Sequence, residues 1–82
     1  MARPPLGWTH APHGGFERWR EPTRAHLVEH AGEPGIWTVR LEVHAIGQPV
    51  QLVAQLVGVS RKRAARWAAA GLDGLDDTPG DG

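Results

Sequence analysis

Residues 48–71 read QPVQLVAQLVGVSRKRAARWAAAG, and this stretch decides the predicted fold. Pro49 suits the first position of a helix, because a residue there has no intrahelical hydrogen bond to lose. Helical spacing would place four apolar residues on one inner face: Val50, Val53, Ala54 and Val57. Gly58 can adopt the positive φ that a tight turn requires. The pattern therefore predicts a first helix over residues 49–57 that ends in a glycine turn.

A second helix is predicted over residues 60–70. The Ser60 hydroxyl is placed to accept a hydrogen bond from the backbone N–H of Lys62 or Arg63, which is the role of an N-cap. Alanine and arginine dominate the following residues and favour a helix, and Gly71 fits its end. Two short helices joined by a tight turn form a helix-turn-helix. We expect this unit at residues 49–70, with Trp67 in its core.

The preceding chain is less regular. Residues 1–16 are rich in proline and glycine, which predicts an irregular arm. Proline at position 22 and glycine at position 32 bracket a predicted helix at 22–31. Residues 36–46 fit two structures, because their apolar residues alternate as in a strand and also form one helical stripe. The downstream context favours the helix.

These elements predict a mainly α fold, a small helical domain with one short strand near 36–45 as the alternative. Residues 1–16 would be the arm, residues 17–71 the helical domain, and residues 72–82 an acidic tail. The chain has 82 residues, which suffices for one domain. It has no cysteine, so disulfides and thiolate metal sites are excluded.

Charge is strongly segregated, although the formal net charge is zero. Five arginines and five glutamates cancel over residues 1–48. Residues 49–71 carry four cations and no acid, whereas residues 72–82 carry four aspartates and no base. A basic block followed by an acidic segment is the clearest global feature of the sequence.

Residues 47–60 (GQPVQLVAQLVGVS), together with Trp67, resemble the N-terminal helix-turn-helix of insertion-sequence transposases. The sequences RWAAAG at 66–71 and TPG at 78–80 resemble the second helix and wing approach of MerR-like and excisionase-like proteins. A basic wing has no counterpart in the acidic residues 72–77. The resemblance implies sequence-specific duplex DNA binding without catalysis or cofactor. The protein would be a small transcriptional regulator or a recombination or transposition accessory factor.

A recognition helix in the major groove presents its first residues to base edges. Arg61 and Lys62 are therefore the candidates for guanine contacts. The candidates for phosphate contacts are Arg63, Arg66, Gln51 and Gln55, with Ser60 at the helix N-terminus. This small number of phosphate contacts predicts modest affinity for DNA. Besides DNA, we therefore expect a partner, either a second copy of the chain in a homodimer or another DNA-bound protein.

Two competing interpretations come from the N-terminal half. A protein-interaction module would need an exposed apolar patch around Trp8, Phe16 and Trp19. The sequence HLVEH at 26–30 matches the H-x-x-E-H of inverzincin metalloproteases, in which His26 and His30 would share a metal, joined by His10 or His13. A chain of this length lacks room for a substrate cleft. We therefore expect no enzymatic activity and no bound metal.

The location of the protein is predicted from the absence of two kinds of segment. Residues 1–15 lack an apolar run of signal-peptide length, and no stretch approaches the length of a membrane span. We therefore expect a cytoplasmic protein without a membrane partner.

Overall fold

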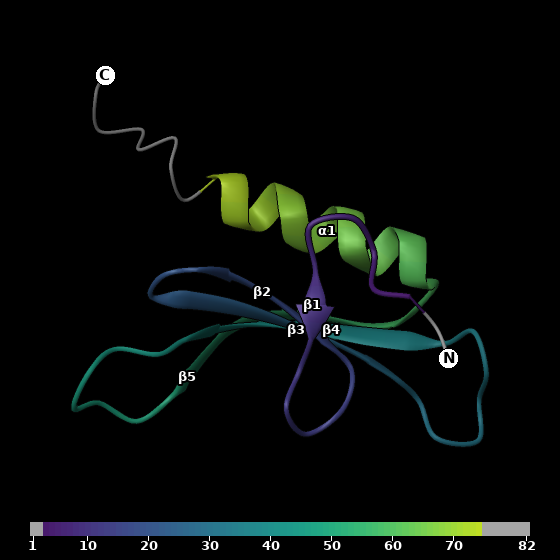
Figure 1. Ribbon diagram of the computed structural model, residues 1–82, viewed down its shortest axis with the longest axis horizontal. Helices are drawn as coiled ribbons and strands as arrows, with labels where there is room; N and C mark the ends of the chain where they lie inside the picture. The colour runs from purple at the N-terminus through teal and green to yellow at the C-terminus, as the bar shows by residue number, and fades with distance from the viewer. Residues whose placement is uncertain (1–2, 75–82) are drawn as a thin grey trace.

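The computed structural model describes residues 3–74. These residues form a five-stranded antiparallel sheet with one helix across one of its faces (Figure 1). The elements are β1 (Thr9–His10), β2 (Phe16–Arg20), β3 (Thr23–Glu29), β4 (Trp37–Val43), β5 (Gln51–Val59) and α1 (Arg61–Gly74). The strands lie side by side in sequence order, so each connection joins neighbours. β1 and β5 are therefore the two edges of the sheet.

In the central strands, buried residues alternate with more exposed ones. In β3 the buried residues are Thr23, Ala25 and Leu27, and in β4 they are Trp37, Val39 and Leu41. Successive side chains of a strand point to opposite faces, so each set lies on one face of the sheet. The register pairs Leu27 with Val39 and Ala25 with Leu41, which brings the two sets together beneath the helix.

The prediction of a mainly α fold is wrong, because three segments predicted or favoured as helices are strands. Residues 22–31 contain β3, and residues 36–46 contain β4, where the strand alternative holds. Residues 49–57, the predicted first helix of the helix-turn-helix, belong largely to β5. β-branched residues favour strands, and β5 is rich in valine. The chain therefore has no helix-turn-helix at residues 49–70.

Gly58 has the positive φ that the sequence predicts, 77°, but it uses this angle inside a strand. Trp37 of β4 pairs with Val59 and Thr38 pairs with Val57, so Gly58 is the extra residue of a bulge. A second irregularity at Val53 lies between the pairs Leu41–Ala54 and Glu42–Leu52. These bulges turn the side chains of Ala54, Leu56 and Val59 toward the helix, where they pack against the core.

The predicted second helix exists, but it continues past Gly71 to Gly74. It buries Ala64, Ala68 and Leu72, which lie one turn apart on a single face. A Cβ added at Gly71 would lie 2.9 Å from Leu41 Cδ1. Gly71 thus permits close approach of α1 to β4, which is a different role from ending the helix.

The N-terminal segment predicted as an irregular arm contributes to the core. Trp8 is 6% exposed and Phe16 is 5% exposed. The Phe16 ring stacks on Trp37 with 5.9 Å between ring centroids, and Trp37 is buried as predicted. Trp67, also predicted in the core, is half-buried against it.

Part of the predicted acidic tail, residues 75–82 with three of its aspartates and the TPG sequence, lies outside the described residues. Within residues 3–74, no helix combines the length and the apolar character needed to cross a membrane.

Candidate nucleic-acid interface

The start of α1 is fixed by Ser60. The backbone N–H of Arg63 donates a hydrogen bond to Ser60 Oγ at 3.2 Å, as predicted. The backbone N–H of Ala64 donates to the Ser60 carbonyl oxygen at 2.9 Å. An N-cap residue has this pair of roles, because it satisfies amide groups that have no partner within the helix. The cap makes Arg61, Lys62 and Arg63 the first three residues of the helix.

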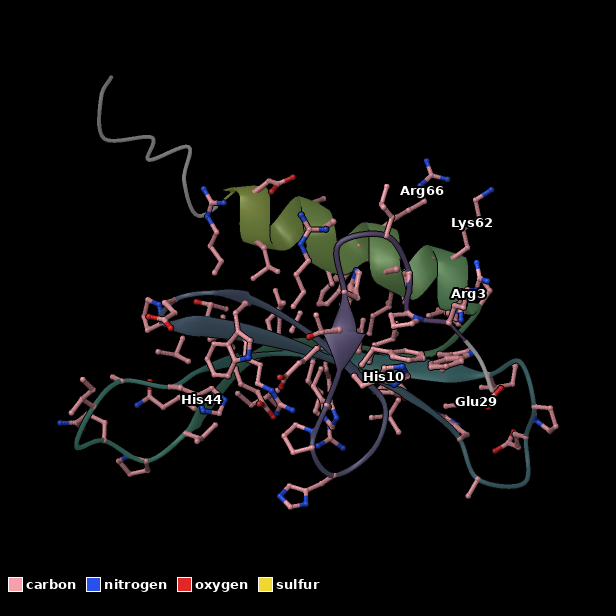
Figure 2. All side chains as sticks on the ribbon, viewed as in Figure 1. Arg3, His10, Glu29, His44, Lys62 and Arg66 are labelled. Carbon is pink, nitrogen blue, oxygen red and sulfur yellow. The ribbon has the colours of Figure 1, made fainter. Side chains whose placement is uncertain are left out.

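Four cations follow this cap within six residues, and we call them the α1 cation cluster: Arg61, Lys62, Arg63 and Arg66. Lys62, Arg63 and Arg66 are exposed, whereas Arg61 is half-buried. Figure 2 shows Lys62 and Arg66 extending from α1 away from the sheet, with Arg3 at the same end of the molecule. The helix therefore presents its charge to solvent on the side opposite the core.

Two shallow grooves flank Lys62 and Arg66. One has a volume of about 690 Å³ and is lined by Ser60, Lys62, Arg63, Arg66, Trp67 and Ala70. The other has a volume of about 400 Å³ and is lined by Pro5, Arg61, Lys62, Ala65 and Arg66. Both grooves are open to solvent, so a large ligand such as a phosphate backbone could reach the cations from either side.

The α1 cation cluster has no acidic partner among residues 3–74. The ion pairs described within residues 3–74 are made by Arg24, His30 and His44, and none of them involves a member of the cluster. The first turn of α1 contains no acid, and the acid nearest in sequence on the helix is Asp73 in the last turn. The charge of the cluster is therefore uncompensated within this part of the chain.

Gln51 and Gln55, predicted to contact phosphates beside the cluster, lie elsewhere. Gln55 pairs with Arg40 of β4, and its neighbours Ala54 and Leu56 face the helix. The Gln55 side chain thus points to the opposite, open face of the sheet. Gln51 is at the far end of β5, about 26 Å along the strand from Val59. The prediction failed because it assigned both residues to a helix.

The structure does not bring His26 and His30 together as metal ligands. The prediction needed a helix, in which residues four apart are neighbours, but His26 lies in β3, where four residues span about 13 Å. His26 Nε2 donates to the Gly14 carbonyl oxygen at 3.0 Å, and His30 Nε2 hydrogen-bonds Thr38 Oγ1 at 2.6 Å. His10 packs against the Phe16 ring, and His13 is exposed. No group of three potential metal ligands occurs in the described part of the chain.

The open face of the sheet carries a charge network that sequence reasoning missed. Arg24 Nε lies 2.8 Å from Glu17 Oε1, and Arg24 NH1 lies 3.2 Å from Glu42 Oε1. His44 Nε2 lies 3.0 Å from the same Glu42 oxygen. The signal is the strand register, which pairs Arg24 with Glu42 and sets Glu17 two residues along β2 from Arg24's partner, on the same face. Its charges offset one another, so this network does not make the open face strongly basic.

Glu42 is the centre of this network. Burial alone would raise the pKa of Glu42. Hydrogen bonds from His44 and Arg24, together with their charges, outweigh burial, and the pKa lies below its ordinary value of 4.5. The carboxylate is thus held in its charged form, as expected of an acid that supports the fold.

No protein-family model matches the chain, and searches of the curated proteins and of the solved structures give no significant match. The residues that resemble the first helix of the transposase helix-turn-helix belong largely to β5. The helix-turn-helix assignment is therefore wrong, and the role in transcription regulation inferred from it has no support in this fold. The α1 cation cluster does not depend on that assignment.

Proposed function

We propose that this protein binds duplex DNA through phosphate contacts made by the first two turns of α1. The observation that carries the proposal is the α1 cation cluster, with three exposed cations and no acidic partner within residues 3–74. Phosphate contacts position a protein on DNA but carry no sequence information. The binding we propose is therefore largely independent of DNA sequence.

The placement of these cations is unfavourable for the free protein. A helix dipole favours acids in the first turn and disfavours cations, by about 0.3–1 kcal/mol per charge. Lys62 and Arg66 are like charges one turn apart, which costs a few tenths of a kcal/mol more. A bound phosphate reverses both effects, because an anion at a helix N-terminus is stabilised by the dipole and by the cations. The cations thus lower the stability of α1 in the free protein, and a bound anionic partner would restore it.

The dimensions of the cluster fit a phosphate backbone. Arg61 to Arg66 spans about 8 Å along the helix axis at 1.5 Å per residue. Successive phosphates on one DNA strand are about 3.4 Å apart along the duplex axis. If α1 lies along the duplex axis, the cluster covers two to three phosphates of one strand. Arginine suits these contacts, because its planar guanidinium can donate two parallel hydrogen bonds to one phosphate.

Duplex DNA fits better than single-stranded nucleic acid. Proteins that bind single strands without sequence preference stack the bases on aromatic side chains. The aromatic residue within the cluster's own groove, Trp67, is half-buried against the core. Part of its ring therefore packs on the core, and the groove contains no fully exposed aromatic side chain on which a base could stack.

The protein-interaction alternative loses the patch that it requires. Trp8 and Phe16 are core residues with 6% and 5% exposure. Trp19 is 44% exposed and packs its ring edge-on against His44, with 5.0 Å between centroids. The three aromatic residues therefore do not form one exposed apolar surface.

Fluorescence anisotropy of a labelled random-sequence duplex, titrated at several salt concentrations, tests the proposal. Two to three phosphate contacts predict that log K falls with log salt with a slope of about −2 to −3. Replacing the duplex sequence should change the affinity by little. A folded protein that does not bind duplex at low salt would contradict the proposal.

A further inference from the structure

The edge strand β5 has no hydrogen-bonded neighbour on its outer side within residues 3–74. It has nine residues, and within residues 3–74 it pairs only with β4. No backbone hydrogen bond joins β5 to a described segment other than β4. The opposite edge, β1, has only two residues. One side of the sheet thus ends in a short strand, and the other ends in a long row of backbone groups open to pairing.

Apolar side chains accompany this open edge. Leu52, Val53 and Val57 are 55%, 61% and 55% exposed. Natural edge strands are commonly protected by lysine, proline, inward-pointing charge or β-bulges. The sequence of β5, QLVAQLVGV, has no lysine, proline or charge, and its bulges at Val53 and Gly58 lie on either side of a regularly paired segment, Ala54–Val57. This central segment is the part of the edge that is available for pairing.

We propose that β5 pairs in antiparallel fashion with β5 of a second copy of this chain, forming a homodimer with one continuous sheet. A two-fold axis centred on Gln55 sets Gln55 of the two copies opposite each other. It also sets Val53 opposite Val57 of the second copy, and Ala54 opposite Leu56. Apolar residues then meet apolar residues, and the two Gln55 amides can exchange hydrogen bonds.

Charge selects a second copy as the occupant. β2, β3 and β4 each carry both acidic and basic residues, whereas β5 carries no charge. Like charges directly opposite each other destabilise strand pairs, and self-pairing of β5 creates no such pair. A charged strand from another protein would find no complementary charge there.

The dimer has a consequence for the α1 cation cluster. The two-fold axis of an antiparallel strand pair is perpendicular to the sheet, so both copies of α1 lie on the same face. Two clusters on one face would double the number of phosphate contacts, which rests on the proposed function. The dimer itself does not depend on DNA binding, so each can fail without the other.

The mass in solution, measured by sedimentation across a range of protein concentrations, tests the dimer. Wild type should give twice the 8.9 kDa of one chain. Val53→Lys/Val57→Lys should give a monomer with an unchanged circular dichroism spectrum, because charge blocks edge pairing. The control Val28→Lys/Ile46→Lys also adds two lysines at exposed apolar positions, away from the edge, and should stay dimeric. A monomeric wild type, or a dimer that persists in the edge variant, would overturn the proposal.

Cysteine cross-linking tests the same pairing without disturbing the strand with charge. The chain has no cysteine, so Gln55→Cys introduces one thiol per copy. Residues opposite each other in an antiparallel pair have Cβ atoms about 4.5–5.5 Å apart, near the reach of a disulfide. Mild oxidation should cross-link this variant. The control Arg40→Cys, one strand inward on the same face, should stay uncross-linked. Equal cross-linking of the two variants, or none in either, would overturn the pairing about Gln55.

Discussion

Arg61 donates a hydrogen bond from NH1 to the backbone carbonyl oxygen of Arg3 at 2.8 Å, across 58 positions of the sequence. The Arg61 guanidinium carbon also lies 5.9 Å from the centroid of the Phe16 ring, which is within the range of a cation–π contact. The first residue of α1 is thus tied to the N-terminal segment and to the core. This contact explains why Arg61 is half-buried while Lys62 and Arg66 remain exposed.

The cap at Ser60 can be separated from the charge of the cluster. Ser60→Ala should lower the free energy of unfolding by about 1 kcal/mol, because the amide of Arg63 loses its acceptor. Ser60→Asp should keep the stability, because aspartate is an equally good cap, but should weaken duplex binding by placing an anion among the cations. Urea unfolding and anisotropy on both variants measure the two effects. Equal stability of the alanine and aspartate variants would contradict the assigned role of the cap.

Gly15 should be far less replaceable than its neighbour Gly14. Both have positive φ, 75° and 108°, which a residue with a side chain rarely adopts. A Cβ at Gly15 would collide with the backbone oxygen of Leu27, whereas a Cβ at Gly14 meets nothing within 4 Å. Gly14→Ala should cost about 1 kcal/mol from backbone strain, and Gly15→Ala should cost at least about 2 kcal/mol more. Thermal unfolding of the pair measures the difference, and equal losses would rule out the backbone collision.

Acid should weaken the fold through Glu42. Its folded-state pKa is lowered, so its contribution to stability is present above pH 4.5 and is lost as the pH falls through the folded value. Wild type should therefore lose stability below about pH 4.5, and Glu42→Gln should lose less over the same range. Glu21→Gln, at an exposed position, is the control and should keep the wild-type profile. A pH profile unchanged in Glu42→Gln would show that the network with Arg24 and His44 contributes little.

Leu72 should belong to the fold and not to a tail. Its side chain is 1% exposed, and it packs with α1 on the sheet. Leu72→Ala should lower the free energy of unfolding by about 2–5 kcal/mol, through lost burial and the cavity that remains. Leu6→Ala removes the same atoms at a position that is 99% exposed, and it should change stability by less than about 0.5 kcal/mol. Denaturant unfolding compares the two, and similar values would contradict the packing of α1 on the sheet.

Local signals in the sequence predicted local features correctly. The hydroxyl at position 60 and the alanine-rich residues after it identify the helix and its cap, which the structure confirms. The same reasoning failed for β5, because the apolar residues of QLVAQLVGV fit both a helical and a strand period. Pairing with β4 decides between them, and this contact is invisible in the segment itself. Ser60 and the four cations therefore lie at the start of a helix, as predicted, whereas Gln51 and Gln55 lie in a strand.

Long-range relationships set the limit of the sequence-based predictions. The contacts of Arg24 with Glu17 and Glu42 join three strands, and only the register of those strands reveals them. The segment that contains β3 has a proline and a glycine at positions that suit helix ends, which concealed the alternation of its buried residues. The missed charge network and the helix wrongly predicted at β3 have one physical cause. The sheet is stabilised by contacts between segments, and the local preferences of a segment only bias its choice between helix and strand.

Duplex binding by two matched double variants tests the central claim most directly. Lys62→Gln/Arg66→Gln removes two exposed cations from α1, and Arg20→Gln/Arg40→Gln removes two exposed cations from β2 and β4. The two variants have the same net charge, so a general charge effect cancels. We predict that the α1 variant binds random-sequence duplex at least about tenfold more weakly at low salt and loses about 2 from its salt slope, while the control stays near wild type. Equal losses in the two variants, or an unchanged α1 variant, would contradict DNA binding through α1.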